Sequence, residues 1–306
     1  MSNTDIFEAS FDYPDPAAGR RLAQLVGIDD QKARLEKGLR LLLDRTAIER
    51  WSERHHGEKL SLVGHFQNRP PLFVLAGDVG TGKTALAETI GHAVAQSEKI
   101  DVTLHRLSLS SRGSGLVGEM TNLISSAFAK VADLGRRAKN NTGKARAAHI
   151  LLIDEADALA QSRETSQMHH EDRAGVNALI RGINELAEDK LPVAVIMCTN
   201  RIGAIDPAVQ RRAADILIFG RPSVDARRNV LALGLEGTGI NKSQIEQLVT
   251  ATGEIDGRPP FTFSDLTQRF LPNLALDAYP DNPITFDRAL AIAKAMKASP
   301  AFREEI

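Results

Sequence analysis

The sequence has a single cysteine, Cys198, among 306 residues, and aromatic residues make up only 5% of it. One cysteine cannot close an internal disulfide, and it excludes a zinc site built from several cysteines. Lysine and arginine (38) nearly balance aspartate and glutamate (39), so the formal net charge is -1. This balance argues against nucleic acid as a partner, although a local basic groove remains compatible with it.

Long apolar runs are also missing, and none reaches the roughly 18 residues that a membrane span requires. Residues 1–16 (MSNTDIFEASFDYPDP) have neither the basic start nor the apolar centre of a secretory signal. The sequence therefore predicts a soluble protein of a reducing compartment, the cytoplasm, with no membrane partner.

Three short runs are almost wholly apolar: residues 71–76 (PLFVLA), 149–153 (HILLI) and 192–198 (PVAVIMC). Runs without alternation are typical of strands that are covered on both faces of a parallel sheet. Residues 102–109 and 215–219 predict two further strands.

Helical periodicity separates these strands. Leu86, Ile90 and Val94 fall on one face of a helix, and residues 121–134 and 176–186 predict two more helices. Strands that alternate with helices predict an α/β fold with a doubly wound parallel sheet.

The composition shifts at residues 220–223 (GRPS), and beyond this point the sequence predicts helices and no strand. Ser223, Asn241 with Gln244, and Thr285 are candidate helix caps. We therefore predict an N-terminal arm (1–24), a large α/β domain (25–220) and a small helical lid domain (221–306).

Residues 77–84 read GDVGTGKT, a G-x-x-x-x-G-K-T pattern between a predicted strand and a predicted helix. In this context the glycines let backbone N–H groups converge on phosphate oxygens, and the helix directs its positive end toward them. We expect Lys83 to contact the β- and γ-phosphates and the Thr84 hydroxyl to bind Mg²⁺. The predicted ATP-binding residues are Asp78, Val79, Gly80, Thr81, Gly82, Lys83, Thr84 and Ala85.

Two carboxylates end the apolar run at 150–155 (ILLIDE). Successive strand residues point to opposite faces, so Asp154 and Glu155 can have separate roles. We expect Asp154 to hold Mg²⁺ and Glu155 to polarise the attacking water. Asp-Glu could also mark only the point where a strand reaches solvent, but the phosphate loop upstream favours the catalytic interpretation.

Together with the phosphate loop, the stretches IDEAD (153–157) and CTN (198–200) resemble those of an AAA+ ATPase. The resemblance implies that Asn200 lies between the metal-site carboxylates and the γ-phosphate and orients the water. From the residue alone, Asn200 is only a polar residue at a strand end.

The stretch IDPAVQRR (205–212) continues this resemblance and implies that Arg211 reaches the γ-phosphate of a neighbouring subunit. Such an arginine stabilises charge in the phosphoryl-transfer transition state. Where the family has a second arginine three residues on, this chain has Ala214, and Arg212 is a candidate substitute.

Three stretches narrow the resemblance to the pachytene-checkpoint type of AAA+ ATPase: RAADILIFGRPS (212–223), GEMTNLISSAF (118–128) and FLPNLALDA (270–278). This likeness implies a homohexameric ring that remodels a HORMA-domain protein, and bacterial relatives act in anti-phage defence. It also implies that Gly27 and Ile28 lie near the adenine. The eukaryotic relatives carry a folded N-terminal domain, for which residues 1–24 are too few.

The lid domain departs from many AAA+ subgroups, because alignment of FLPNLA places Leu266 where an arginine contacts the nucleotide. Arg258 and Arg269 flank this position, and Arg258 in the DGR turn is the candidate for the missing contact.

The stretch GLVGE (115–119) occupies the place of the loop that lines the channel of AAA unfoldases. We expect Leu116 and Val117 to grip the substrate, since apolar side chains on a glycine-flanked loop are seldom core residues. The alternative is ordinary packing of both side chains against their own subunit.

Two polar segments invite other interpretations. Residues 162–173 contain His169, His170, Glu171 and Asp172, but consecutive ligands rarely converge on one ion, so a second pore loop is favoured over a metal site. The second segment is a basic cluster that we interpret as a solvated face: Arg136, Arg137, Lys139, Lys144 and Arg146.

These observations together predict a Mg²⁺-dependent ATPase that remodels a HORMA-domain protein partner. Two alternatives stay open: a nucleic-acid-associated ATPase that resembles a helicase loader, and an ATP-gated scaffold with little turnover. DNA-stimulated hydrolysis would favour the first alternative, and the presence of Glu155 argues against the second.

Overall fold

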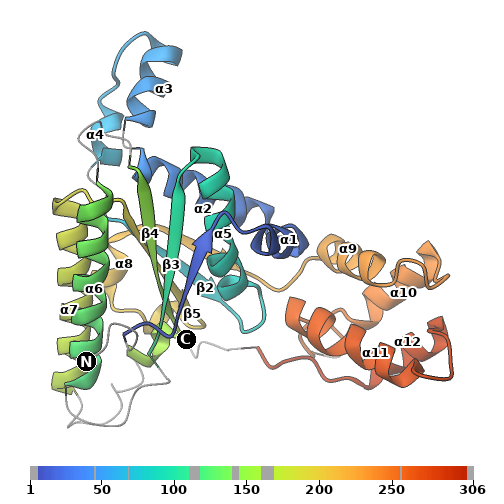
Figure 1. Ribbon diagram of the computed structural model, residues 1–306. Helices are drawn as coiled ribbons and strands as arrows, with labels where there is room; N and C mark the ends of the chain where they lie inside the picture. Colours follow the sequence, from blue (N-terminus) through green and yellow to red (C-terminus); the bar gives the residue numbers. More distant parts are fainter. Residues whose placement is uncertain are drawn as a thin grey trace. The chain divides into compact units, whose positions relative to one another are not determined.

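The computed structural model describes residues 6–44, 46–67, 69–109, 118–139, 145–159, 169–255 and 257–301 (Figure 1). Its contacts divide the chain into two compact units. We call the first the sheet unit (residues 1–23, 30–76 and 84–218) and the second the helical unit (residues 24–29, 77–83 and 219–306). Among the helices of the described residues, none has the length and apolarity to cross a membrane.

The sheet has six strands in the order β1-β3-β4-β5-β2-β6. The strand β3 pairs in parallel with β4, β4 with β5, and β5 with β2, whereas β1 runs antiparallel to β3 at one edge. The strands are β1 (Ala9–Tyr13), β2 (Leu72–Gly77), β3 (Asp101–Ser108), β4 (Ala147–Asp154), β5 (Val193–Thr199) and β6 (Ala213–Phe219). This sheet, with the helical C-terminal portion, confirms the predicted fold class.

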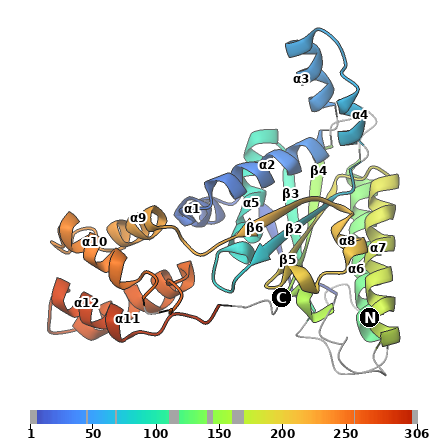
Figure 2. The same cartoon turned by 180° about the vertical axis from the view of Figure 1, so that it is seen from behind.

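Helices cover both faces of the sheet, as Figures 1 and 2 show from opposite sides. Leu72 packs in the cluster formed with α6 and α7, while the next residue, Phe73, meets Gly38 of α2 on the other face. The helices of the sheet unit are α1 (Pro16–Gln24), α2 (Asp29–Leu43), α3 (Ala47–His56), α4 (Leu62–Gln67), α5 (Lys83–Glu98), α6 (Glu119–Ala138), η1 (Ala156–Leu159), α7 (His169–Glu188), η3 (Ile202–Ala204) and α8 (Pro207–Gln210).

The strand β1 lies in the segment 1–24, which the sequence analysis named only as an arm without predicting a strand there. Its Tyr13 is buried beside Gly91 of α5, where a Cβ on the glycine would come within 2.5 Å of the tyrosine ring. The Tyr13 hydroxyl also donates a hydrogen bond to the backbone carbonyl of Glu88. The N-terminal segment is therefore built into the edge of the sheet.

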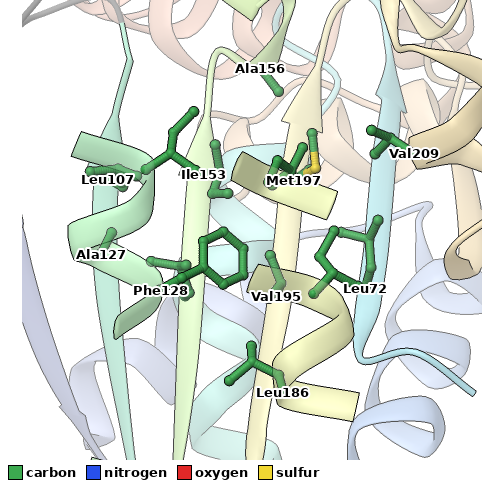
Figure 3. Close-up of a cluster of buried hydrophobic side chains, with 14 of the residues drawn as sticks. Leu72, Leu107, Ala127, Phe128, Ile153, Ala156, Leu186, Val195, Met197 and Val209 are labelled. Carbon is green, nitrogen blue, oxygen red and sulfur yellow. The ribbon is translucent and has the colours of Figure 1, made fainter. Parts of the chain in front are cut away.

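One apolar core cluster of the sheet unit lies between the sheet and the pair α6–α7 (Figure 3). Phe128 of α6 lies so close to α7 that a Cβ on Gly182 would be 2.2 Å from its ring. Ile153, Val195 and Met197 cover the strand side of this cluster. Cys198, the only cysteine, is buried in β5.

The helical unit packs around its own apolar cluster, in which Leu266, Phe270 and Leu274 are fully buried. Its helices are α9 (Val224–Gly234), α10 (Lys242–Ala251), the π-helix η4 (Asp265–Phe270), α11 (Leu271–Ala278) and α12 (Phe286–Ala295).

Two of the three predicted caps form. The Ser223 hydroxyl accepts a hydrogen bond from the N–H of Ala226, and Asn241 and Gln244 make a reciprocal capping box. Thr285 precedes α12 but makes no side-chain cap hydrogen bond.

Candidate functional site

The phosphate loop joins β2 to α5, with Gly77 at the end of the strand and Lys83 at the start of the helix. Gly80 has a φ of 75°, in the left-handed region that favours glycine. A Cβ at this position would lie 2.7 Å from the Cβ of Ser264 and 2.8 Å from Oγ1 of Thr262. The loop backbone can therefore take this course only with glycine.

Polar contacts within the loop hold its lysine in place. Lys83 Nζ donates to the carbonyl oxygens of Gly77 and Asp78, each at 2.8 Å. Thr81 Oγ1 donates to the same Asp78 carbonyl at 2.7 Å. A buried ammonium group at the first turn of a helix makes the loop suitable for binding an anion.

The structure brings the phosphate loop together with Gly27 and Ile28 in the helical unit. Gly27 has a φ of 78°, and a Cβ there would lie 2.5 Å from the Cβ of Ala226. The buried Ile28 side chain reaches Gly82: a Cβ added to this glycine would lie 3.6 Å from Ile28 Cδ1. Of the other predicted loop residues, Val79 and Ala85 are exposed.

In the sheet unit, the structure brings Thr84 and Asp154 into contact. Thr84 Oγ1 donates to Asp154 Oδ1 at 3.2 Å, and the Glu155 N–H donates to the same oxygen at 3.0 Å. Burial is the main cause that raises the pKa of Asp154 above its ordinary value. A hydroxyl and a carboxylate side by side are the hard oxygen donors that Mg²⁺ prefers, so these residues fit that ion.

Glu155 differs from its neighbour in both exposure and backbone. Its side chain is exposed, whereas Asp154 is buried, and its φ of 54° lies in the left-handed region. A residue with a side chain pays about 1–2 kcal/mol for this conformation, which is often found at functional sites. The two carboxylates therefore have the different surroundings that separate roles require.

Arg106 of β3 is a site residue that the sequence analysis missed. Its Nη2 lies 3.5 Å from Asp154 Oδ2, its Nη1 donates to Glu88 Oε1 at 2.7 Å, and its Nε lies 3.3 Å from Glu8 Oε2. Burial is also the main cause that raises the pKa of Glu88. The available signal was a cation inside a predicted strand, where a partly buried charge needs an acidic partner.

Asn200 follows the end of β5, the strand beside β4. Its backbone N–H donates to Asp157 Oδ1 at 3.2 Å, and Thr199 Oγ1 donates to the same oxygen at 3.3 Å. Asp157 was also missed, and it links the segment after β4 to the end of β5. Asn200 is thus held at the same edge of the sheet as Asp154.

The structure separates the two arginines at the end of α8. Arg212 Nε donates to Asn184 Oδ1 at 3.2 Å, and its Nη1 donates to the Ala208 carbonyl at 2.9 Å. Arg211 is exposed, and within the described part of the chain its side chain has no hydrogen bond or ion pair. Arg211 is therefore the arginine available to a neighbouring molecule.

Arg258 lies exposed on a tight turn of the helical unit, where its N–H donates to the Ile255 carbonyl at 2.9 Å. Leu266 is fully buried, and Arg269 donates to Asp265 Oδ1 at 2.5 Å. No contact between Arg258 and the phosphate loop occurs in the hydrogen bonds and ion pairs of the described residues. Its role stays a prediction.

Some predicted residues lie outside the described part of the chain. These include the pore residues Leu116 and Val117 and most of the segment 162–173. Within the described residues, no group of three or more His, Cys, Asp and Glu side chains is arranged to hold a metal ion. In the basic cluster, Arg136 forms ion pairs with three carboxylates on the exposed face of α6 and α7: Asp133, Glu185 and Asp189.

Comparison with known proteins places this chain in a family. Residues 73–221 match the family model "ATPase family associated with various cellular activities (AAA)". CD-NTase-associated protein 6 of Escherichia coli (strain MS 115-1) is 54% identical over 97% of this chain and 96% of its own.

Solved structures extend the comparison to the whole chain. One chain from the E. coli MS115-1 HORMA:CdnC:Trip13 complex superposes with a TM-score of 0.90, at 53% identity over 97% of both chains. Rhizobiales Trip13 superposes with a TM-score of 0.77, at 48% identity over 96% of this chain and 99% of its own. The chain therefore belongs to the AAA ATPase family, within the group that includes CD-NTase-associated protein 6.

Proposed function

We propose that this chain is a Mg²⁺-dependent ATPase that works as a homohexamer and remodels a HORMA-domain protein in cytoplasmic anti-phage signalling. The observation that carries the ATPase part is the contact between Thr84 and Asp154, beside an exposed Glu155. The partner is inferred from the similarity to the chain solved with a HORMA protein. In this proposal, residues 25–220 form the ATPase domain and residues 221–306 form the lid.

The residues divide the work of hydrolysis as follows. The phosphate loop and Lys83 bind the phosphates, and Gly27 and Ile28 lie against the adenine. Thr84 and Asp154 would hold Mg²⁺, which supplies positive charge to the phosphates when it is bound. Glu155 accepts a proton from the attacking water.

Three further roles complete the proposal. Asn200 orients the attacking water, and Arg211 stabilises the transition state in the neighbouring subunit. Arg258 contacts the nucleotide from the lid. Leu116 and Val117 grip the unfolded segment of the partner.

The test measures ATP turnover with Mg²⁺ and with EDTA, in the presence and absence of a purified HORMA-domain protein. We expect turnover to need Mg²⁺, to rise with the HORMA protein and to be lost in Lys83→Ala. The rate at which a protease cleaves the HORMA protein should rise when ATP is added to the wild-type enzyme, and it should stay low with Lys83→Ala. Stimulation by DNA alone, or negligible turnover with the HORMA protein, would contradict the proposal.

A further inference from the structure

A carboxylate lies within the loop that is expected to bind phosphates. Asp78 is the first residue after Gly77 in GDVGTGKT, where the pattern itself sets no residue type. Like charges repel, and the repulsion between a carboxylate and a triphosphate grows as water is excluded from the space between them. This loop therefore needs a positive charge that offsets Asp78.

Arg221 supplies that charge from the segment that follows β6. Its Nε donates to Asp78 Oδ2 at 2.8 Å, and the two side chains are only 10% and 20% exposed. A charge-assisted hydrogen bond that is largely shielded from water is stronger than an exposed ion pair. Both residues belong to the helical unit, so their contact is internal to one compact unit.

The guanidinium is itself fixed on its other edge by two backbone carbonyls. Its Nη1 donates to the Pro260 carbonyl at 2.6 Å, and its Nη2 donates to the Ser299 carbonyl at 2.9 Å. A planar group with three bonds in different directions has little freedom to rotate. Arg221 is therefore a rigid connection and not a flexible surface charge.

Ser299 is held in turn, through its N–H and its hydroxyl, by a fully buried carboxylate. Asp265 accepts hydrogen bonds from the Ser299 N–H at 3.0 Å and from the Ser299 hydroxyl at 2.8 Å. It also accepts one at 3.0 Å from the N–H of Thr262, whose side chain packs on Gly80. A continuous set of bonds thus runs from residue 299 to the phosphate loop.

We propose that Arg221 is a positioning residue for nucleotide binding: it neutralises Asp78 and fixes the phosphate loop to the C-terminal segment around Ser299. Arg221 acts through Asp78 and takes no part in the chemical step. Replacing Arg221 should therefore weaken ATP binding, while the rate at which the enzyme hydrolyses bound ATP should stay nearly the same. This inference rests on the proposed ATP site.

The test compares Arg221→Met with the double variant Arg221→Met/Asp78→Asn. We expect the single variant to raise KM for ATP, and the Kd for a slowly hydrolysed ATP analogue with Mg²⁺, by about tenfold, with kcat within about threefold. Replacing the Asp78 carboxylate by a neutral amide in the double variant should bring the Kd back to within about threefold of wild type. A merely structural role for Arg221 would leave the double variant as weak as the single one.

The matched control is Arg228→Met, which removes an arginine of the same unit that pairs with Asp225 and Glu246 on the surface. Its Kd should equal that of wild type. If Arg221→Met does not fold, Arg221→Lys takes its place, because lysine keeps the positive charge but lacks the planar guanidinium. We expect its Kd to be about threefold higher than that of wild type, and adding Asp78→Asn should bring this Kd back toward the wild-type value.

Two results would overturn the inference: unchanged nucleotide affinity in Arg221→Met, or no recovery in the double variant. Lys83→Ala separates this outcome from failure of the proposed function. If Lys83→Ala abolishes binding and Arg221→Met does not weaken it, only the role of Arg221 is wrong. If Lys83→Ala binds the analogue as wild type does, the ATP site itself is wrong.

Discussion

At the scale of single residues, the end of β4 combines a buried and an exposed carboxylate in consecutive positions. Asp154 accepts hydrogen bonds from Thr84 and from the Glu155 N–H. Glu155 has the left-handed backbone that turns the chain away from the strand. A conformation that is unfavourable for glutamate is retained at the place where the proposed chemistry needs a carboxylate.

This conflict predicts that Glu155→Gly is more stable but inactive. Glycine adopts a φ of 54° without steric cost, so the free energy of unfolding should rise by about 1 kcal/mol. ATP turnover should fall at least about a hundredfold, because the proton acceptor is lost. Urea unfolding and a phosphate-release assay measure the two effects.

Glu155→Gln is the matched control, because it removes the charge and keeps the backbone cost. It should lose turnover to a similar extent without gaining stability. Equal stability of the glycine and glutamine variants would contradict the argument from backbone strain.

Residues of the candidate site that belong to compact motifs could be proposed from the sequence, whereas those that act through the fold were missed. Lys83, Thr84 and Asp154 are recognisable because a local pattern surrounds each of them. Arg106 and Asp157 depend on which strands are neighbours, because each contacts a residue of the adjacent strand or of the segment that follows it. Strand order was not available from spacing alone.

At the scale of elements, two histidines connect β3 with β4 beside the edge strand β1. His105 Nδ1 lies 3.1 Å from the Ser10 hydroxyl, and its Nε2 lies 3.3 Å from His149 Nδ1. Burial, followed by the charge of His149, lowers the pKa of His105 to about 4, against the effect of Asp12. Burial also lowers the pKa of His149.

The lowered pKa values predict that acid weakens the fold. As the pH falls below the ordinary histidine pKa of 6.5, the unfolded chain takes up protons that folded His105 does not bind until about pH 4. Stability is therefore complete above pH 6.5 and is lost between pH 6.5 and 4, with a cost on the order of 2 kcal/mol at pH 5.

Urea unfolding at pH 7.5 and pH 5 measures this loss, and His105→Gln should reduce the difference between the two pH values. The control His56→Gln, at an exposed position of α3, should keep it. An identical pH dependence in wild type and His105→Gln would show that the histidine pair does not contribute.

The helical unit allows a second prediction, because two of its helices begin with different caps. The reciprocal capping box of Asn241 satisfies backbone donors at the start of α10, so Asn241→Ala should destabilise the protein by about 1 kcal/mol. Thr285→Ala should cost less, since Thr285 makes no side-chain cap hydrogen bond. Thermal unfolding of the two variants gives the comparison, and equal costs would contradict it.

Buried strands were easier to predict than edge or irregular elements. All seven residues of β5 are buried, and such a run is apolar throughout. The strand β1 is short and only its last residue is buried, so its sequence has a weak strand signal. The π-helix η4 has no sequence signature comparable to a cap, because its register depends on packing in the helical unit.

At the scale of the whole molecule, we expect substitutions of the two arginines after α8 to have different effects, one on activity and one on stability. Arg211 is exposed and should act between subunits, whereas Arg212 is bound to Asn184 and Ala208 of its own chain. Arg211→Ala subunits mixed into wild type should lower ATP turnover by more than their share, while leaving the Tm unchanged. Arg212→Ala should instead lower the Tm, since it leaves internal hydrogen bonds unmade.

The measurement is turnover per wild-type subunit against the fraction of variant, and it is repeated across protein concentrations. Activity that rises with concentration and falls steeply with Arg211→Ala indicates shared sites. A turnover per wild-type subunit that stays constant at every variant fraction and every protein concentration would mean that each chain works alone.

The single buried cysteine has a practical consequence. Cys198 lies within the central strand β5, so thiol reagents should reach it only when the sheet opens. Cysteines introduced on the surface could then be labelled for distance measurements without first replacing Cys198. In mild denaturant, the rate at which Cys198 reacts with a thiol reagent measures how often the sheet opens.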